Sequence, residues 1–153
     1  ELRTRVTGLD CRPLNPSLTV GRWLNTALTL SSGTPSSGID FGCSVALPPG
    51  ARMSRMVARA HGGTTGVSGN SRAEVRVGIT NDDGGYFSAG GTVSFTSTNW
   101  ATSTDPSTPG DRISTGQSVA LRVRMRSTGG AAKAEFAWAD IYYIVDSYTQ
   151  LRT

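Results

Sequence analysis

Apolar and polar residues alternate along several short stretches of the chain, which is the pattern of β-strands with one buried face. The clearest stretch is 39–47, where every second residue is apolar until Pro48 removes a ladder donor and ends the strand. The same two-residue period recurs, with varying clarity, in four further stretches: 20–30, 73–79, 92–96 and 119–125. Residues 53–60 are also expected to form a strand, although both of its faces mix apolar and basic residues. The pattern therefore predicts a protein built from strands.

Residues 131–148 are ambiguous between helix and strand. Their alanines are compatible with a helix, but the β-branched and aromatic run from Ile141 to Val145 favours a strand. In a strand of strict period, Phe136 and Trp138 share one face, and the other face is apolar too. The segment is thus predicted to be a central strand covered on both sides, with Trp138 in the core.

The strands and their connections predict one all-β domain. With 153 residues the chain suits a single domain, and Gly-rich or Ser/Thr-rich connections separate about eight strands at the spacing of an antiparallel β-sandwich or barrel. We expect an extended arm over 1–19, a sandwich over 20–148 and a tail over 149–153. The longest weakly patterned stretch, 97–117, is predicted to be a binding loop or a flap that contacts a partner.

Composition excludes several other classes. Charged residues make up 17% of the chain, which is too few for a coiled coil or a helical bundle, and the hydrophobic share of 37% argues against disorder. No apolar run approaches the roughly 20 residues that span a bilayer, so no membrane partner is expected.

The net charge of +4 comes from 15 basic and 11 acidic residues, and Lys133 is the only lysine. Arg122, Arg124 and Arg126 point outward from one strand about 6.6 Å apart, and Arg76 extends this row if the two strands are neighbours. The row is either a docking surface for an acidic protein or a solvated face neutralised by acids on adjacent strands. Nucleic acid is not expected, because no aromatic residues interleave with the row.

Cys11 and Cys43 are the two cysteines. They are too few for a zinc site of four ligands, and form either one disulfide or two buried thiols. The oxygen-rich turn Asn81–Asp83 lacks the ligand spacing of a calcium loop, so a hairpin turn explains it without metal. We predict no metal and no cofactor.

The sequence offers little catalytic chemistry. The one histidine, His61, would need Asp40 or Asp140 as its partner in a Ser/His/Asp arrangement, and no serine lies in a Gly-x-Ser-x-Gly turn. A solvated loop position is expected for His61. Glu74, Glu135 and Asp140 could meet as paired carboxylates, but cross-strand pairing with arginine explains them equally. The chain is predicted not to be an enzyme.

Three tryptophans, Trp23, Trp100 and Trp138, are either core residues or platforms for sugar stacking. Trp100 lies in the long predicted loop and is the best candidate for an exposed platform, followed by Tyr86 after a Gly pair. These residues motivate one functional hypothesis, a secreted carbohydrate-binding β-sandwich module with a glycan as partner.

The segment Val45–Gly50 ends a strand in Leu-Pro-Pro-Gly, and Asp140–Tyr143 forms an aromatic closing strand. This pattern resembles jelly-roll modules of viral and extracellular proteins, similar in kind to the decoration, head-fibre and tail-fibre proteins of tailed bacteriophages. The resemblance implies a jelly-roll fold and a non-catalytic structural protein of the virion. It also implies a homotrimer whose arm or loops bind the capsid shell or a neighbouring fibre subunit. This is the first functional prediction, and the extracellular carbohydrate-binding module is its alternative.

Overall fold

The computed structural model describes ten parts of the chain: residues 1–14, 21–24, 27–30, 39–62, 72–81, 87–95, 99–105, 113, 117–126 and 134–145. Within these parts, side chains are not described for residues 21–24, 27–30, 39, 72, 87–91 and 126. No helix in the described parts has the length and apolar character needed to cross a membrane.

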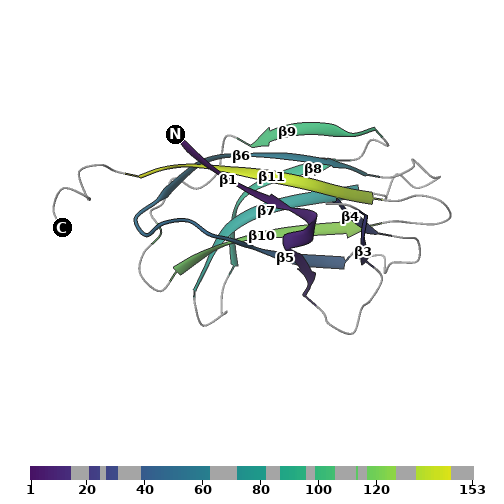
Figure 1. Cartoon of the computed structure of the whole chain (residues 1–153), viewed down its shortest axis with the longest axis horizontal. Helices are drawn as coiled ribbons and strands as arrows, with labels where there is room; N and C mark the ends of the chain where they lie inside the picture. The colour runs from purple at the N-terminus through teal and green to yellow at the C-terminus, as the bar shows by residue number, and fades with distance from the viewer. Residues whose placement is uncertain are drawn as a thin grey trace.

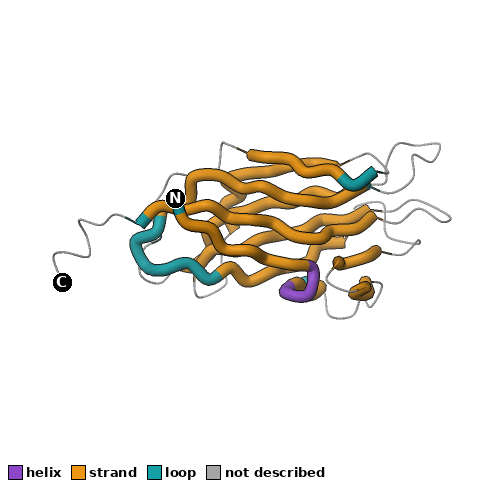
Figure 2. The backbone as a smooth tube through the Cα atoms, turned by 45° about the horizontal axis from the view of Figure 1, so that its top comes forward, coloured by secondary structure: helices purple, strands orange, loops and turns teal. Residues whose placement is uncertain are grey.

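Two antiparallel sheets face each other (Figures 1 and 2). The main path of sheet A runs β3 (Gly21–Leu24), β4 (Ala27–Leu30), β11 (Ala134–Ile144), β6 (Arg52–His61) and β9 (Ala101–Asp105). Sheet B runs β2 (Cys11–Pro13), β5 (Ile39–Val45), β10 (Gln117–Arg126), β7 (Arg72–Asn81) and β8 (Phe87–Phe95). The predicted all-β antiparallel sandwich is confirmed.

The core lies between the sheets and follows the predicted alternation. Sheet B contributes Phe41, Val75, Val77, Leu121 and Val123, all fully buried. Sheet A contributes a second set of fully or nearly fully buried side chains: Met53, Met56, Ala58, Ala60, Phe136, Ala139 and Ile141. Each inward face is apolar because burying such side chains stabilises the fold by about 25 cal/mol per Å².

Several strands differ from the prediction in extent. The structure has eleven strands in its described parts, three more than the eight expected. The stretch 20–30 forms the hairpin β3–β4 instead of one strand. The predicted loop 97–117 contains β9, and β8 begins at Phe87 within a stretch expected to be a connection. Strands rich in Ser, Thr and Gly were missed because their composition matches that of loops.

The N-terminal segment is not an extended arm, because residues 2–13 pair with both sheets. Strand β1 (Leu2–Thr7) pairs with β11 over Trp138–Tyr143, on the edge of β11 that β4 occupies farther along. The 3₁₀ turn η1 (Gly8–Asp10), in which Asp10 accepts a hydrogen bond from the Thr7 amide at 2.8 Å, then leads into β2. Figure 1 shows this path in purple. The prediction failed because this pairing is set by a strand more than 130 residues away.

Cys11 and Cys43 form a disulfide, which settles the alternative that the sequence left open. They are directly opposite each other on the neighbouring strands β2 and β5, with their Cα atoms 4.2 Å apart. Both cysteines are buried. The bond therefore fixes the N-terminal segment to sheet B.

A β-bulge in β11 decides which aromatic rings face outward. Phe136 pairs with Ala60 and Trp138 pairs with Arg59, so Ala137 is an extra residue in the ladder. Such an insertion reverses the alternation of the strand beyond it. Phe136 consequently lies in the core, whereas Trp138 lies on the outer face of sheet A.

Candidate functional site

The outer face of sheet A combines aromatic rings with arginines. Its aromatic residues are Trp100 beside β9, and Trp138 and Tyr142 on β11. Its arginines are Arg3 and Arg5 on β1, and Arg52, Arg55 and Arg59 on β6. We call this surface the sheet A face. It is assembled from β1, β6, β9 and β11, which are far apart in the sequence but are neighbours in sheet A (Figure 1).

Trp100 stands at the corner of the sheet A face where β6 ends and β9 begins. It is 39% exposed, whereas His61 beside it is 8% exposed. The two rings meet edge to face with centroids 4.5 Å apart, and His61 Nε2 lies 3.1 Å from Glu135 Oε1. A buried imidazole held by a carboxylate thus packs edge to face against an indole that is partly open to solvent.

Arg59 completes this corner. Its Nη1 donates a hydrogen bond to Thr102 Oγ1 at 3.2 Å, and its Cζ lies 5.6 Å from the centroid of the Trp100 ring. We call Trp100, His61, Glu135, Arg59 and Thr102 the Trp100 corner. It places a flat apolar ring among groups that can donate and accept hydrogen bonds.

The other two rings of the sheet A face lie beneath guanidinium groups. Arg5 Cζ is 4.2 Å from the centroid of Trp138, and Arg55 Cζ is 3.8 Å from the centroid of Tyr142. These are cation–π distances. The predicted core position of Trp138 is wrong because the bulge at Ala137 turns its ring to the outer face.

Ion pairs hold these guanidinium groups in place. Arg5 donates from Nε and Nη2 to both carboxylate oxygens of Asp140, at 2.7 and 2.8 Å, and Arg3 approaches the same carboxylate at 3.5 Å. The hydrogen bonds to Asp140 raise the pKa of Arg5. On β6, the hydrogen bonds from Arg55 to Glu1 likewise raise the pKa of Arg55.

The residues considered for catalysis have structural neighbours that account for their positions. His61 ends β6 and is buried, so the predicted solvated loop position is wrong. Its carboxylate neighbour is Glu135, whereas Asp40 pairs with Arg124 on sheet B. Glu74 lies on sheet B and Glu135 on sheet A, so these acids do not form one carboxylate pair.

The outer face of sheet B carries the predicted arginine row. β7 and β10 are neighbours, and Arg76 lies directly opposite Arg122, as the row required. Arg124 donates to Asp40 at 2.7 and 3.1 Å, which raises the pKa of Arg124, and Arg76 pairs with Glu74. Acids on adjacent strands thus partly neutralise the row. The side chain of Arg126 lies outside the described residues.

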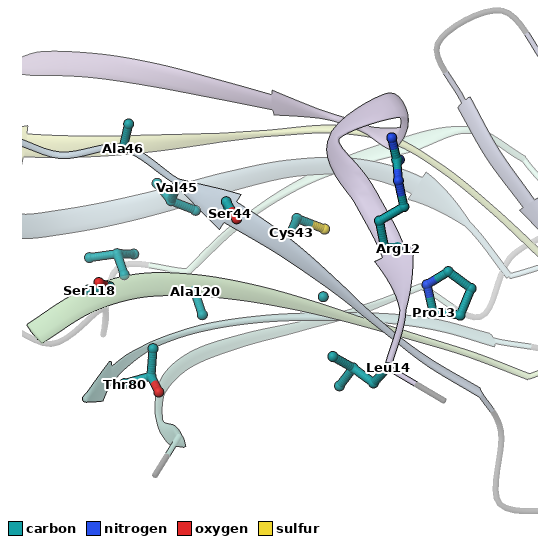
Figure 3. Close-up of a pocket in the computed structure, with 12 residues that line it drawn as sticks. Arg12, Pro13, Leu14, Cys43, Ser44, Val45, Ala46, Thr80, Ser118 and Ala120 are labelled. Carbon is teal, nitrogen blue, oxygen red and sulfur yellow. The ribbon is translucent and has the colours of Figure 1, made fainter. Parts of the chain in front are cut away.

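A shallow groove of about 480 Å³ also lies on sheet B. Figure 3 shows its lining from β5, β10 and β7, with Leu14 following β2 at one end. Leu14 packs against Gly42, which has no side chain; a Cβ there would come within 2.8 Å of Leu14 Cδ2. The described lining contains aliphatic and hydroxyl groups and Arg12, but no aromatic ring.

Three other predictions fall partly or wholly outside the described residues. Tyr86 is outside them, and of the turn Asn81–Asp83 only Asn81 is described. The side chain of Trp23 is not described either. Within the described parts, no three His, Cys, Asp or Glu residues lie close enough together to hold a metal ion.

Sequence reasoning found Trp100 but missed Trp138, Tyr142 and the arginines above them. The available signal was the mixture of basic and apolar residues in 53–60, where Arg55 and Arg59 share a face. Their aromatic partners could not be placed without knowing about the bulge.

No family model matches this sequence, and no curated protein matches it. Several solved structures share its fold. The CBM36-1 domain of a multidomain xylanase from the hindgut metagenome of Trinervitermes trinervoides is 12% identical, with a TM-score of 0.56 over 92% of this chain and 97% of that one. The low affinity xylan binding module CBM86 from Roseburia intestinalis is 9% identical, with a TM-score of 0.56 over 94% and 97%.

A third similar structure is the carbohydrate-binding module CBM36 in complex with calcium and xylotriose, 13% identical, with a TM-score of 0.56 over 91% of this chain and 99% of that one. Each of the three is covered over almost its whole length, so the likeness extends to the complete sandwich. At these identities it shows the fold: the chain is a jelly-roll β-sandwich, as the strand-end pattern implied.

Proposed function

We propose that this chain is a non-catalytic module that binds carbohydrate at the Trp100 corner. The observation that carries the proposal is an exposed indole held edge-on by a buried histidine, with Arg59, Thr102 and Glu135 around it. A sugar presents an apolar face and a rim of hydroxyl groups. A binding site that matches both has an aromatic platform and a few fixed polar groups.

Rigidity distinguishes Trp100 from an ordinary exposed side chain. Single exposed aromatic residues are common on protein surfaces and by themselves indicate nothing. Trp100, however, packs against a histidine that is itself bound to Glu135, so its ring has little freedom to lose when a ligand stacks on it. Preorganisation of this kind strengthens binding by reducing its entropic cost.

Two further observations support the proposal. The three similar structures are carbohydrate-binding modules by name, and two of the names mention xylan or xylotriose. The disulfide between Cys11 and Cys43 favours an oxidising compartment, which suits an extracellular module. We therefore propose that the module acts outside the cell and that plant cell-wall polysaccharides belong in the first set of ligands tested.

The test is binding to an array of neutral and acidic polysaccharides, followed by affinity electrophoresis on those that bind. Trp100→Ala is expected to weaken binding by about tenfold or more, which corresponds to roughly 1.4 kcal/mol of lost stacking. Leu9→Ala is the matched control, because Leu9 is similarly exposed but lies in η1. Absence of binding on the array, or equal effects of the two variants at an unchanged circular dichroism spectrum, would contradict the proposal.

The virion role suggested by the strand-end pattern stays a prediction. It requires self-association, since a fibre or decoration protein of this kind would be a homotrimer whose subunits bury about 2,000 Å² or more. Size-exclusion chromatography with light scattering distinguishes it from the carbohydrate-binding module. A monomer at all concentrations would argue against the virion role and leave carbohydrate binding unaffected.

A further inference from the structure

The sheet A face carries more guanidinium groups than carboxylates to neutralise them. Arg3 and Arg5 share the single carboxylate of Asp140, and Arg55 pairs with Glu1. In the described part of the chain, Arg52 and Arg59 have no carboxylate partner. The surplus positive charge therefore lies on the same face as the exposed indole.

Stacking fixes where these guanidinium groups can donate. Arg5 and Arg55 lie over the rings of Trp138 and Tyr142, and Arg59 lies beside Trp100. A guanidinium has five N–H donors in a planar fork that matches a carboxylate, and stacking on a ring leaves its edges available for hydrogen bonds. The rings thus help to position the guanidinium groups without occupying their N–H donors.

Arg59 is the guanidinium closest to the sugar platform. It donates to the neutral Thr102 hydroxyl at 3.2 Å, and its Cζ is 5.6 Å from the centre of the Trp100 ring. A sugar stacked on Trp100 would carry its ring substituents over this guanidinium. Glu135 is the acidic group of the corner, and it is bound to His61, which it faces across the β6–β11 pairing.

From this arrangement we infer that the glycan is acidic: the Trp100 corner binds a polysaccharide that carries uronate groups, with Arg59 receiving the carboxylate. The inference rests on the proposed function, since Trp100 is the platform that brings the carboxylate to Arg59. Charge complementarity supplies the argument for a carboxylate over a hydroxyl, because a charge-assisted bidentate hydrogen bond is about twice as strong as a neutral one. Arg59 differs in this respect from Arg124 and Arg76 on sheet B, which are already paired with acids.

The experiment compares each acidic polymer with its own neutral form. Glucuronoxylan, polygalacturonate and hyaluronan are tested beside the same polymers after chemical reduction of their carboxyl groups to alcohols, by affinity electrophoresis and calorimetry at low and moderate salt. At least one acidic polymer is expected to bind about tenfold more tightly than its reduced form, and this preference is expected to shrink as salt rises.

Three variants locate the effect. Arg59→Gln is expected to remove the preference for the acidic polymer while binding of the reduced form persists. Arg59→Lys, which keeps the charge but loses the planar fork, is expected to retain part of the preference. Arg12→Gln makes the same change in net charge on exposed β2 of sheet B and is expected to leave the preference intact.

The outcomes separate the inference from the function on which it rests. If acidic and reduced forms bind equally well, the inference is overturned and carbohydrate binding stands. If no form of any polymer or array glycan binds, both are overturned. If Arg12→Gln lowers the preference as much as Arg59→Gln does, the attraction is a property of the net charge and the assignment to Arg59 is wrong.

Discussion

The two outer faces of this sandwich use the same residue, arginine, in opposite ways. On sheet B, Arg124 lies between Asp40 and Glu74 on the two neighbouring strands, and it donates to Asp40. On the sheet A face, Arg5 and Arg55 cover aromatic rings, and the described carboxylates are fewer than the guanidinium groups. On sheet B the two acids thus neutralise Arg76 and Arg124, whereas on the sheet A face guanidinium groups lie beside aromatic rings as well as carboxylates.

This difference shows that a row of arginines in a sequence says little about function until its neighbours are known. The row with Arg122 and Arg124 was conspicuous because its members follow each other at every second position. The arginines of sheet A come from β1 and β6, and they become a surface only through the pairing of both strands with β11. The more conspicuous pattern belongs to sheet B, where Asp40 and Glu74 pair with two of its arginines.

The sheets also hold the N-terminal segment differently, by a covalent bond to sheet B and by ion pairs to sheet A. Breaking the disulfide is expected to have the largest effect on stability. Cys11 and Cys43 are 32 residues apart, and in the chain-entropy model closing such a loop stabilises the fold by about 3–4 kcal/mol. Reduction of the native protein should lower its free energy of unfolding in urea by about this amount.

The same experiment separates the roles of the two faces. The variant Cys11→Ala/Cys43→Ala should match the reduced protein in stability and should not respond to a reductant. While it stays folded, its affinity for glycan should equal that of the oxidised protein, because the bond lies on sheet B. A loss of affinity without unfolding would show that the disulfide shapes the Trp100 corner and that the two faces are not independent.

A second comparison replaces one carboxylate on each face. Asp140 is almost completely buried and receives two guanidinium groups that are about half exposed, whereas Asp40 and Arg124 are each about one-third exposed. We expect Asp140→Asn to cost about 1–2 kcal/mol after allowance for the exposure of the arginines, and Asp40→Asn about 0.2–1 kcal/mol. Urea denaturation of both variants at neutral pH measures the difference, and equal costs would mean that the buried carboxylate of Asp140 contributes no more to stability than the more exposed one of Asp40.

The sequence predicted the inward residues of sheet B better than the outer face of sheet A. The inward residues of β5, β7 and β10 were predicted well, because a strand with one buried face leaves a period of two in the sequence. The outward position of Trp138 was missed, since the bulge at Ala137 is one extra residue with no signature of its own. β1 was missed because its partner lies at the other end of the chain. Core positions are thus encoded locally, whereas the sheet A face depends on register.

The smallest expected effect concerns the outermost ion pair of the sheet A face. Ser54 Oγ donates to Glu1 Oε2 at 2.6 Å and Arg55 donates to Glu1 Oε1 at 3.0 Å, and these bonds, with Ser54 first, lower the pKa of Glu1 below its ordinary value of 4.5. A lowered pKa means that the bonds stabilise the fold above pH 4.5 and that this contribution disappears as pH falls through the folded pKa.

The carboxyl ¹³C shift of Glu1, followed by NMR during acid titration, should have its midpoint below 4.5. Ser54→Ala and Arg55→Gln should each raise the midpoint, whereas Asp40→Asn, on the opposite face, should leave it unchanged. A midpoint at the ordinary value in the unmodified protein would show that this edge of the sheet A face is not held by Glu1.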